Sequence, residues 1–233
     1  MIIFAKGFNY SQDGPGNRLV YHLSGCNMHC PWCSNPEGMC SAGGKKYTVE
    51  QIFEECKSCR SMFFGGGGVT FTGGEATLQA DELLRLLKML KNEKIHTAIE
   101  TNGTSERLTE IAAYVDYLIM DFKHFDTRKL QMITGVGNEM IKQNFESFCE
   151  SRRQLCIRIP LVNGFNTQTP TGFADYFSKY DTKNVSFEFL AYHEYGKEKW
   201  KTPYTVKNGF VSDAQLKTFK RVFTDNKLRI INT

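Results

Sequence analysis

The chain has 233 residues, of which 41% are hydrophobic and 23% are charged, and its formal net charge at pH 7 is +4. This length is enough for one α/β domain with a buried core, and the composition is not that of a disordered chain. The small net charge gives no reason to expect a nucleic-acid ligand, and without an apolar run of about 18 residues a membrane span is not expected.

The cysteine content bears on the compartment. Residues 1–7 lack the basic, apolar and cleavage regions of a signal peptide. Eight cysteines in a chain of this length do not form a small secreted disulfide scaffold, and clustered cysteines in a reducing cytosol more often bind metal. We therefore expect a cytoplasmic protein that forms a single domain over residues 1–233 and acts as a monomer.

The first part of the chain combines a turn, a strand and a cysteine-rich loop. Asp13-Gly14-Pro15-Gly16 is a strong turn signal, and the apolar run over residues 18–23 predicts a strand. The loop that follows carries three cysteines at a C-x3-C-x2-C spacing: Cys26, Cys30 and Cys33. In parallel α/β barrels the sites lie at the carboxyl ends of strands, so this loop is the first candidate site.

The three thiols predict a particular kind of metal site. A zinc ribbon or finger pairs two short Cys/His clusters to obtain four ligands, whereas this loop has no obvious fourth ligand. Cysteine thiolate is the usual ligand of iron–sulfur clusters, so three thiolates can hold a [4Fe–4S] cube and leave one iron open. An open iron is useful in an enzyme, because a substrate or cofactor can chelate it. A zinc-binding or disulfide loop is the alternative on these residues alone.

Strands and helices alternate along the rest of the chain. Thr48 and Gln51 form a capping-box pattern that begins a helix. Further helices are predicted over residues 79–94, 106–114, 126–133, 138–153, 170–180 and 212–224. Further strands are predicted over residues 69–72, 95–103 (ending in a polar cluster), 117–123, 155–162, 185–190 and 228–231. Six β/α units predict a parallel sheet rolled into an incomplete barrel, with the candidate groups at strand ends.

Cys40, Cys56 and Cys59 could form a second metal site. Cys56 and Cys59 are three residues apart on the predicted helix that begins after Thr48, so they share one face. Buried or half-exposed thiols are the simpler account of all three. The four glycines at 65–68 lack the Gly-Lys-Ser/Thr of a phosphate loop, and we reject that function.

Several strand ends carry polar groups. Gly73 and Gly74 lack Cβ atoms, which lets a ligand approach the backbone. Asp121 and Lys123 share one strand face, where opposite charges need a partner; an exposed ion pair is the alternative. Arg158 lies between apolar neighbours, where a guanidinium usually has a carboxylate to hold.

The pattern C-x3-C-x-Φ-C, with Trp32 before the last cysteine, resembles the signature of radical S-adenosylmethionine (SAM) enzymes. The Asp-Gly-Pro-Gly turn, the Gly-Gly-Glu strand end and the ending Tyr-His-x-x-Gly-x-x-Lys-Trp over residues 192–200 narrow this to activating enzymes of glycyl radical enzymes, of the pyruvate formate-lyase type. The resemblance extends from Asp13 to Trp200. It implies a partial, laterally open (β/α)6 TIM-type barrel, whose opening admits a loop of another protein.

The resemblance also implies the roles of single residues. Cys26, Cys30 and Cys33 would hold a [4Fe–4S] cluster whose open iron is chelated by SAM. The implied SAM contacts are Trp32, Gly73, Gly74, Glu75, Glu100, Asp121, Lys123, Arg158 and His193. The family has Asp where this chain has Glu100, which leaves open both an ordinary strand-end carboxylate and the family's monovalent-cation site. Asp13 and Gly14 would lie near the docking place of the partner's glycine loop.

The implied reaction is glycyl radical formation. A flavodoxin- or ferredoxin-type donor would reduce the cluster, and SAM cleavage would give a 5′-deoxyadenosyl radical that takes a hydrogen atom from a glycine Cα of the partner glycyl radical enzyme. The chemistry belongs to the cofactors, so no acid–base residue is expected.

Two alternatives belong to other classes. A radical SAM enzyme acting on a small molecule, similar to 7-carboxy-7-deazaguanine synthase, would lack the ending over residues 192–200. An iron–sulfur or zinc-binding module without catalysis would have no use for the Gly-Gly-Glu and Asp-x-Lys strand ends.

Overall fold

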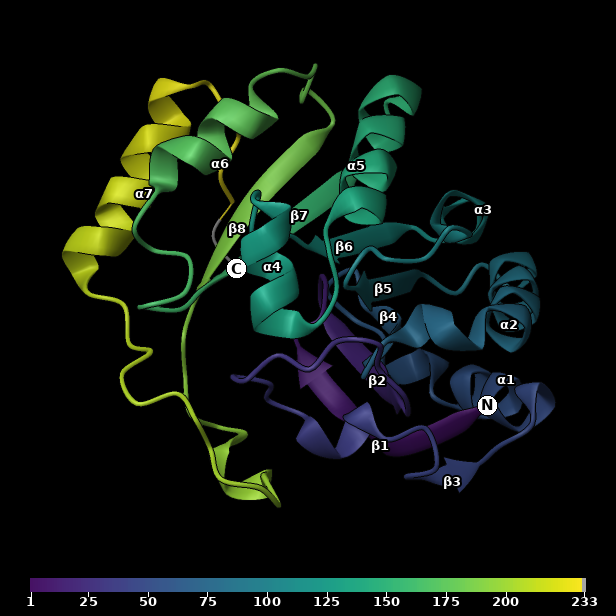
Figure 1. Ribbon diagram of the computed structural model, residues 1–233. Coiled ribbons are helices and arrows are strands. Elements are labelled where there is room, and N and C mark those ends of the chain that lie inside the picture. The colour runs from purple at the N-terminus through teal and green to yellow at the C-terminus, as the bar shows by residue number, and fades with distance from the viewer. Residues whose placement is uncertain (232–233) are drawn as a thin grey trace. The chain divides into compact units, whose positions relative to one another are not determined.

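The computed structural model describes residues 1–231, which form two compact units (Figure 1). The first unit comprises Met1–Asn27 and Asn35–Ile119, and the second comprises Met28–Ser34 and the described part of Met120–Thr233. The expectation of a single domain stays a prediction.

The secondary structure is an alternation of strands and helices. The strands are β1 (Ile2–Tyr10), β2 (Asn17–Leu23), β3 (Lys45–Lys46), β4 (Gly68–Gly73), β5 (Thr97–Thr101), β6 (Tyr117–Asp121), β7 (Leu155–Leu161) and β8 (Val185–Ala191). The helices are α1 (Val49–Ser58), α2 (Ala80–Asn92), α3 (Leu108–Ala112), α4 (Thr127–Thr134), α5 (Glu139–Ser151), α6 (Pro170–Phe177) and α7 (Asp213–Asp225).

The strands are hydrogen-bonded in the order β3-β1-β2-β4-β5-β6-β7-β8, which is an open sheet. The α/β fold class is therefore confirmed, and the six predicted core strands correspond to β2 and β4 to β8. Two strands were not predicted: β1, which pairs antiparallel with β2, and the short β3. The strand predicted over residues 228–231 is reduced to one bridge, between Ile230 and Phe187.

In the first unit, side chains alternate between a helix-facing and an opposite face of the parallel strands. Tyr21 of β2 stacks on Phe71 of β4, with ring centroids 5.7 Å apart, and its hydroxyl is 3.8 Å from the Cys56 thiol of α1. The neighbouring positions therefore point away from α1, and Thr72 and Glu100 hydrogen-bond to each other there. The capping box of Thr48 and Gln51 and the buried leucines of α2 are as expected.

In the second unit, the strands pack against their helices through a core of aromatic side chains. Phe187 of β8 contacts Phe177 of α6 and Phe223 of α7, with ring centroids 4.7 and 5.2 Å apart. Helices α6 and α7 lie side by side next to β8 (Figure 1). Because side chains alternate along a strand, Glu188 points to the face away from these helices, and Arg158 is its register partner on β7.

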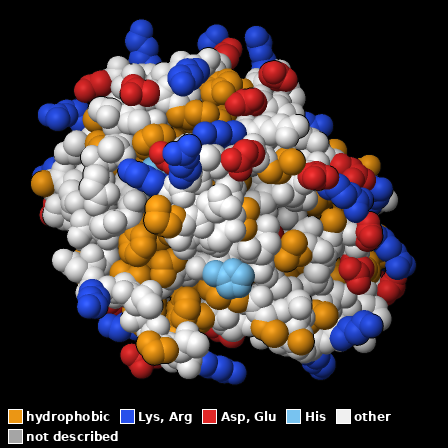
Figure 2. Space-filling model, in the orientation of Figure 1, with side chains coloured by type: hydrophobic (Ala, Val, Ile, Leu, Met, Phe, Trp, Pro, Cys, Tyr) orange, Lys and Arg blue, Asp and Glu red, His pale blue; other side chains and the backbone are white. Residues whose placement is uncertain are grey.

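The surface carries both signs of charge. On the face drawn in Figure 2, Lys and Arg side chains are interspersed with Asp and Glu, as the small net charge leads one to expect. Within residues 1–231, none of the helices is both long and apolar enough to cross a membrane.

His124, which is 1% exposed, is expected to make folding sensitive to acid. Its Nδ1 accepts a hydrogen bond from the Asp126 amide at 2.9 Å, so the ring is neutral with its proton on Nε2. Burial, with Lys129 and Lys142 adding to it, lowers the pKa of His124 from 6.5 to about 4, and Asp126 acts the other way. The unfolded chain therefore takes up the proton first as the pH falls.

The stabilisation is complete above pH 6.5 and is lost as the pH falls towards about 4, by about 3 kcal/mol. Urea unfolding between pH 7 and pH 4 measures this loss. The His124→Gln variant, whose amide oxygen can still accept from Asp126, should lose about 3 kcal/mol less over the same range. Equal pH dependence of the two proteins would contradict the prediction.

Candidate functional site

The first part of the cysteine loop, up to Asn27, belongs to the first unit. Gly25 donates its amide to the Gly38 carbonyl at 2.8 Å, and Cys26 donates to the Met39 carbonyl at 3.3 Å. The Gly25 carbonyl in turn accepts the Glu75 amide at 2.7 Å. The backbone of Gly25 and the Cys26 amide are thus held by the short 3-10 helix Pro36–Met39 and by the residues that follow β4.

The second part of the loop, from Met28, belongs to the second unit. Cys33 donates its amide to the Cys30 carbonyl at 3.1 Å, which closes a tight turn, and His29 donates to the Thr134 carbonyl at the end of α4. The Trp200 indole N–H donates to the Cys33 carbonyl at 3.1 Å. The ending over residues 192–200, whose only predicted site residue is His193, therefore packs on the cysteine loop.

Trp32 and His193 lie at the same end of the second unit. Trp32 packs edge-on against Phe165, with ring centroids 5.0 Å apart, beside a small core of Val162, Tyr192 and Val206. His193 is half-buried and stacks on Tyr195, with ring centroids 4.3 Å apart. Burial lowers the pKa of His193, so the ring is neutral near pH 7.

Gly73, the last residue of β4, and Gly74 are required by the fold itself. A Cβ on Gly73 would lie 2.2 Å from the Leu23 amide nitrogen, and one on Gly74 would lie 2.2 Å from the Gly25 carbonyl oxygen. Both clashes are with backbone, which no side-chain movement can relieve. A ligand contact at these glycines stays a prediction, while their need for close backbone packing is a finding.

Glu75 is 1% exposed and lies at the centre of a hydrogen-bond network. One carboxylate oxygen accepts from the Thr77 amide and hydroxyl and from the Thr101 hydroxyl, the last at 2.7 Å. The other accepts the Asn102 amide at 2.6 Å. Glu75 therefore ties the end of β4 to the end of β5.

Glu100 is half-buried on β5, and its carboxylate accepts from the Thr72 hydroxyl at 2.9 Å. Both side chains lie on the strand face away from α1. A carboxylate at this position could contribute to a cation site, which stays a prediction.

Two ion pairs of the second unit involve predicted site residues, and the first joins Asp121 and Lys123. Lys123 Nζ is 2.6 Å from an Asp121 carboxylate oxygen, and the two side chains are 10% and 32% exposed. The two residues therefore form an ion pair with each other, which was the alternative to a ligand contact. The lysine of this pair is largely buried rather than exposed.

Arg158 has the carboxylate that its apolar surroundings predicted. Its Nε donates to Glu188 Oε2 at 2.7 Å, and the side chains are 9% and 2% exposed. Glu188 was not predicted, although a carboxylate inside the apolar run of β8 was a visible signal. Its second oxygen is buried without a hydrogen-bond partner among residues 1–231.

The Asp13–Gly16 turn lies at the amino end of β2, whereas the cysteine loop leaves the carboxyl end of the same strand. Arg18, fully buried, holds the turn by donating to the Pro15 carbonyl at 2.9 Å and to the Thr70 hydroxyl at 2.6 Å. Burial lowers the pKa of Arg18 to about 10, so it remains charged near pH 7. Contact of Asp13 and Gly14 with a partner stays a prediction.

Cys40, Cys56 and Cys59 differ in their burial. Cys56 is buried against Tyr21, and burial raises its pKa to about 12, which opposes the thiolate form that a metal needs. Cys59 is half-buried at the end of α1, and Cys40 is exposed.

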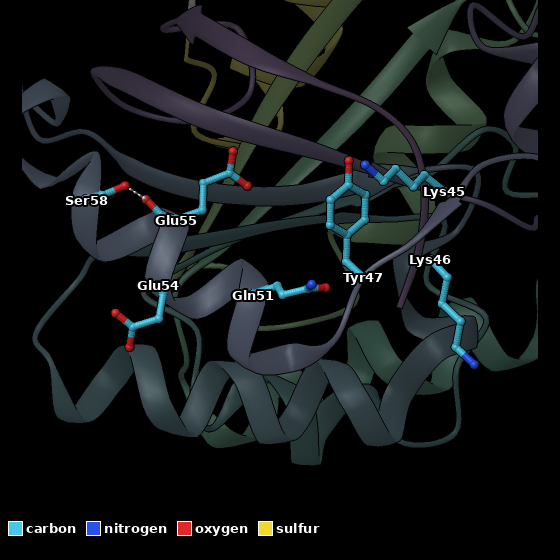
Figure 3. Close-up of a pocket in the computed structure, with 7 residues that line it drawn as sticks. All are labelled: Lys45, Lys46, Tyr47, Gln51, Glu54, Glu55 and Ser58. Carbon is cyan, nitrogen blue, oxygen red and sulfur yellow. Dashed lines mark hydrogen bonds between the residues drawn. The ribbon is translucent and has the colours of Figure 1, made fainter.

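A pocket of about 500 Å³ lies beside α1 and β3, and it contains none of the predicted site residues (Figure 3). Its lining residues are Lys45, Lys46, Tyr47, Gln51, Glu54, Glu55 and Ser58. Glu55 already pairs with Lys6 at 2.5 Å and accepts from the Tyr21 hydroxyl at 2.7 Å. We assign it no function.

The three cysteines of the loop fit an iron–sulfur cluster by their chemistry. Of these three, Cys30 is buried and the other two are half-buried. Within residues 1–231, no three His, Cys, Asp or Glu side chains are already arranged around a position for a metal ion. The fit to a cluster therefore rests on the chemistry of the three thiols. Thiolates in a partly buried loop suit a [4Fe–4S] cluster.

Comparison with known proteins defines the class that corresponds to this fold and loop. The Radical SAM superfamily profile matches residues 20–177, which is more than half of the chain. Among solved structures, Streptococcus suis SuiB bound to its precursor peptide SuiA aligns with a TM-score of 0.71 over 92% of this chain and 48% of that chain, at 16% identity. That likeness concerns the fold alone.

More similar proteins narrow the class. The choline trimethylamine-lyase activating enzyme of Oleidesulfovibrio alaskensis is 30% identical over 274 aligned positions, covering 88% of each chain. The pyruvate formate-lyase 1-activating enzyme of Escherichia coli K12 is 34% identical, covering 81% of this chain and 79% of that protein. A solved domain of a pyruvate-formate lyase-activating enzyme from Bacteroides vulgatus aligns with a TM-score of 0.61 and 25% identity, over 72% of this chain and 99% of that chain. The chain belongs to the glycyl radical enzyme activating enzymes of the radical SAM superfamily.

Proposed function

We propose that this protein activates a partner glycyl radical enzyme of the pyruvate formate-lyase type by removing a hydrogen atom from the Cα of a glycine. The observation that carries this proposal is the loop after β2 with cysteines at the C-x3-C-x2-C spacing, in a chain that aligns along 88% of its length with an activating enzyme. A small-molecule radical SAM enzyme is disfavoured, because the more similar relatives are activating enzymes.

The family's cofactors are a [4Fe–4S] cluster and SAM. In this chain Cys26, Cys30 and Cys33 would hold the cluster and leave one iron open for SAM. When bound, the two cofactors together supply the one-electron chemistry of hydrogen-atom removal. The protein itself would bind and orient the cofactors and the glycine of the partner, and would exclude solvent from them.

The residues around the loop would serve orientation. Asp121, the last residue of β6, and Lys123, two residues later, present a carboxylate and an ammonium, which match the amino and carboxylate groups of the SAM methionine. The supporting contacts would come from Trp32, Gly73, Gly74, Glu75, Glu100, Arg158 and His193. We further propose that a cation binds beside Glu100, that Asp13 and Gly14 contact the partner enzyme, and that the electron donor is of the flavodoxin or ferredoxin type. The protein would act as a monomer in the cytoplasm.

The test is the direct observation of the product radical. The reconstituted protein, SAM and a chemical reductant would be mixed without oxygen with pyruvate formate-lyase, choline trimethylamine-lyase or 4-hydroxyphenylacetate decarboxylase. We expect the electron paramagnetic resonance (EPR) signal of a glycyl radical with the pyruvate formate-lyase-type partner. The proposal would be overturned if the protein binds the cluster and cleaves SAM but none of the three glycyl radical enzymes shows this signal.

A further inference from the structure

Asn102, directly after β5, is a buried polar residue that the proposed mechanism does not use. Its side chain is in the first unit and the residue is 6% exposed. Its Nδ2 is 2.8 Å from Asn27 Oδ1 and 4.0 Å from Cys26 Sγ, a distance at which an amide can still donate to the large sulfur atom. Its Oδ1 lies 3.1 Å from the Thr104 amide nitrogen and 2.7 Å from the Thr104 hydroxyl.

The orientation of this side-chain amide is fixed by its surroundings. Oxygen and nitrogen of an Asn amide are usually assigned from their hydrogen-bond partners. The Thr104 backbone N–H can only donate, so the atom that faces it must be the oxygen of Asn102. The NH2 group therefore faces the cysteine loop, where one hydrogen is directed to Asn27 and the other to Cys26.

The position of Asn102 is held at its backbone as well. The Asn102 amide donates to Glu75 Oε2 at 2.6 Å, and Glu75 is itself held by Thr77 and Thr101. Asn27 closes a ring by donating its own amide to the Thr104 hydroxyl at 2.8 Å. A donor fixed from both ends loses little conformational freedom when it bonds to the sulfur.

We propose that Asn102 is a positioning residue that raises the reduction potential of the cluster by donating an N–H to Cys26 Sγ. This inference rests on the proposed function, in which Cys26 is a cluster ligand. One-electron reduction adds negative charge to the cluster and its sulfurs, and a hydrogen bond to a ligand sulfur favours the more negative state. The amide thereby makes the cluster easier for an electron donor to reduce.

The experiment is an EPR-monitored redox titration of the reconstituted protein, without SAM. We expect Asn102→Leu, which keeps the approximate shape and removes the donor, to reduce the ratio of reduced to oxidised cluster about tenfold at the wild-type midpoint, a shift of about 59 mV to lower potential. Iron and sulfide content are measured on the same samples. Thr104→Val is the matched control, because it loosens the same ring and leaves the Asn102 donor in place.

A second variant covers the case in which Asn102→Leu does not fold. Asn102→Asp keeps the acceptor for Thr104 and replaces the donor by an oxygen, so it should lower the potential at least as far. A wild-type midpoint in a variant with a full cluster overturns this inference alone. An equal shift in Thr104→Val also overturns it, since the effect would then follow from the loosened ring. A wild-type protein that binds no cluster overturns the proposed function instead.

Discussion

Replacing any one of Cys26, Cys30 and Cys33 with alanine is expected to reduce SAM cleavage to background. Two thiolates cannot hold three irons of a cube, so the cluster should be lost or incomplete in each variant. The measurements are iron and sulfide per chain after anaerobic reconstitution, and the 5′-deoxyadenosine formed with SAM and a chemical reductant.

The matched controls are Cys40→Ala and Cys59→Ala, which remove thiols of similar or greater exposure outside the loop. Both should retain the cluster and cleave SAM at the wild-type rate. Full activity in Cys30→Ala would remove the basis of the cluster assignment. Loss of the cluster in Cys40→Ala would show that the ligands of the cluster are not confined to the three cysteines of the loop.

Breaking the Arg158–Glu188 pair is expected to have the largest effect on stability. Arg158→Met leaves the Glu188 carboxylate, 2% exposed and 2.7 Å from the missing guanidinium, as an uncompensated buried charge. Removal of one partner of such a pair typically costs about 3–5 kcal/mol in the free energy of unfolding. Urea unfolding at pH 7, compared with the wild-type protein, measures the difference.

The double variant Arg158→Met/Glu188→Leu is the control, because it removes both charges and fills the space with apolar side chains. Replacement of a whole buried pair is often neutral. We therefore expect it to recover most of the lost stability while remaining inactive if Arg158 contacts SAM. A single variant that unfolds within about 1 kcal/mol of the wild type would contradict the prediction.

Most of the sheet was predictable because the strands β2 and β4 to β8 are largely apolar runs of the sequence. Strand β1 was missed because Ala5–Asn9 is mostly exposed and contains Gly7, so the run lacks the alternation that marks a half-buried strand. Its pairing with β2 supplies what the local pattern lacks. Residues 228–231 show the reverse: an apolar run that forms only one bridge.

The candidate site was predictable where a motif is local, and less so where it depends on tertiary contacts. The cysteine spacing and the Asp121–Lys123 pair are readable from neighbouring positions. The partners of Glu75 come from Thr77, Thr101 and Asn102, and no local pattern gives the last two. Glu188 is 30 positions away from Arg158, so only the register of β7 and β8 reveals their pairing.

The close approach of the chain to Gly73 and Gly74 affects how these two positions behave in a mutational screen. Every larger residue would press a carbon atom into Leu23 or Gly25 before any small molecule enters. Loss of growth or of enzyme turnover on substitution at these positions would therefore reflect impaired folding of the chain. A chemical change that spares the side chain, such as an ester in place of the amide, would be needed to detect recognition of a ligand by the glycine backbone.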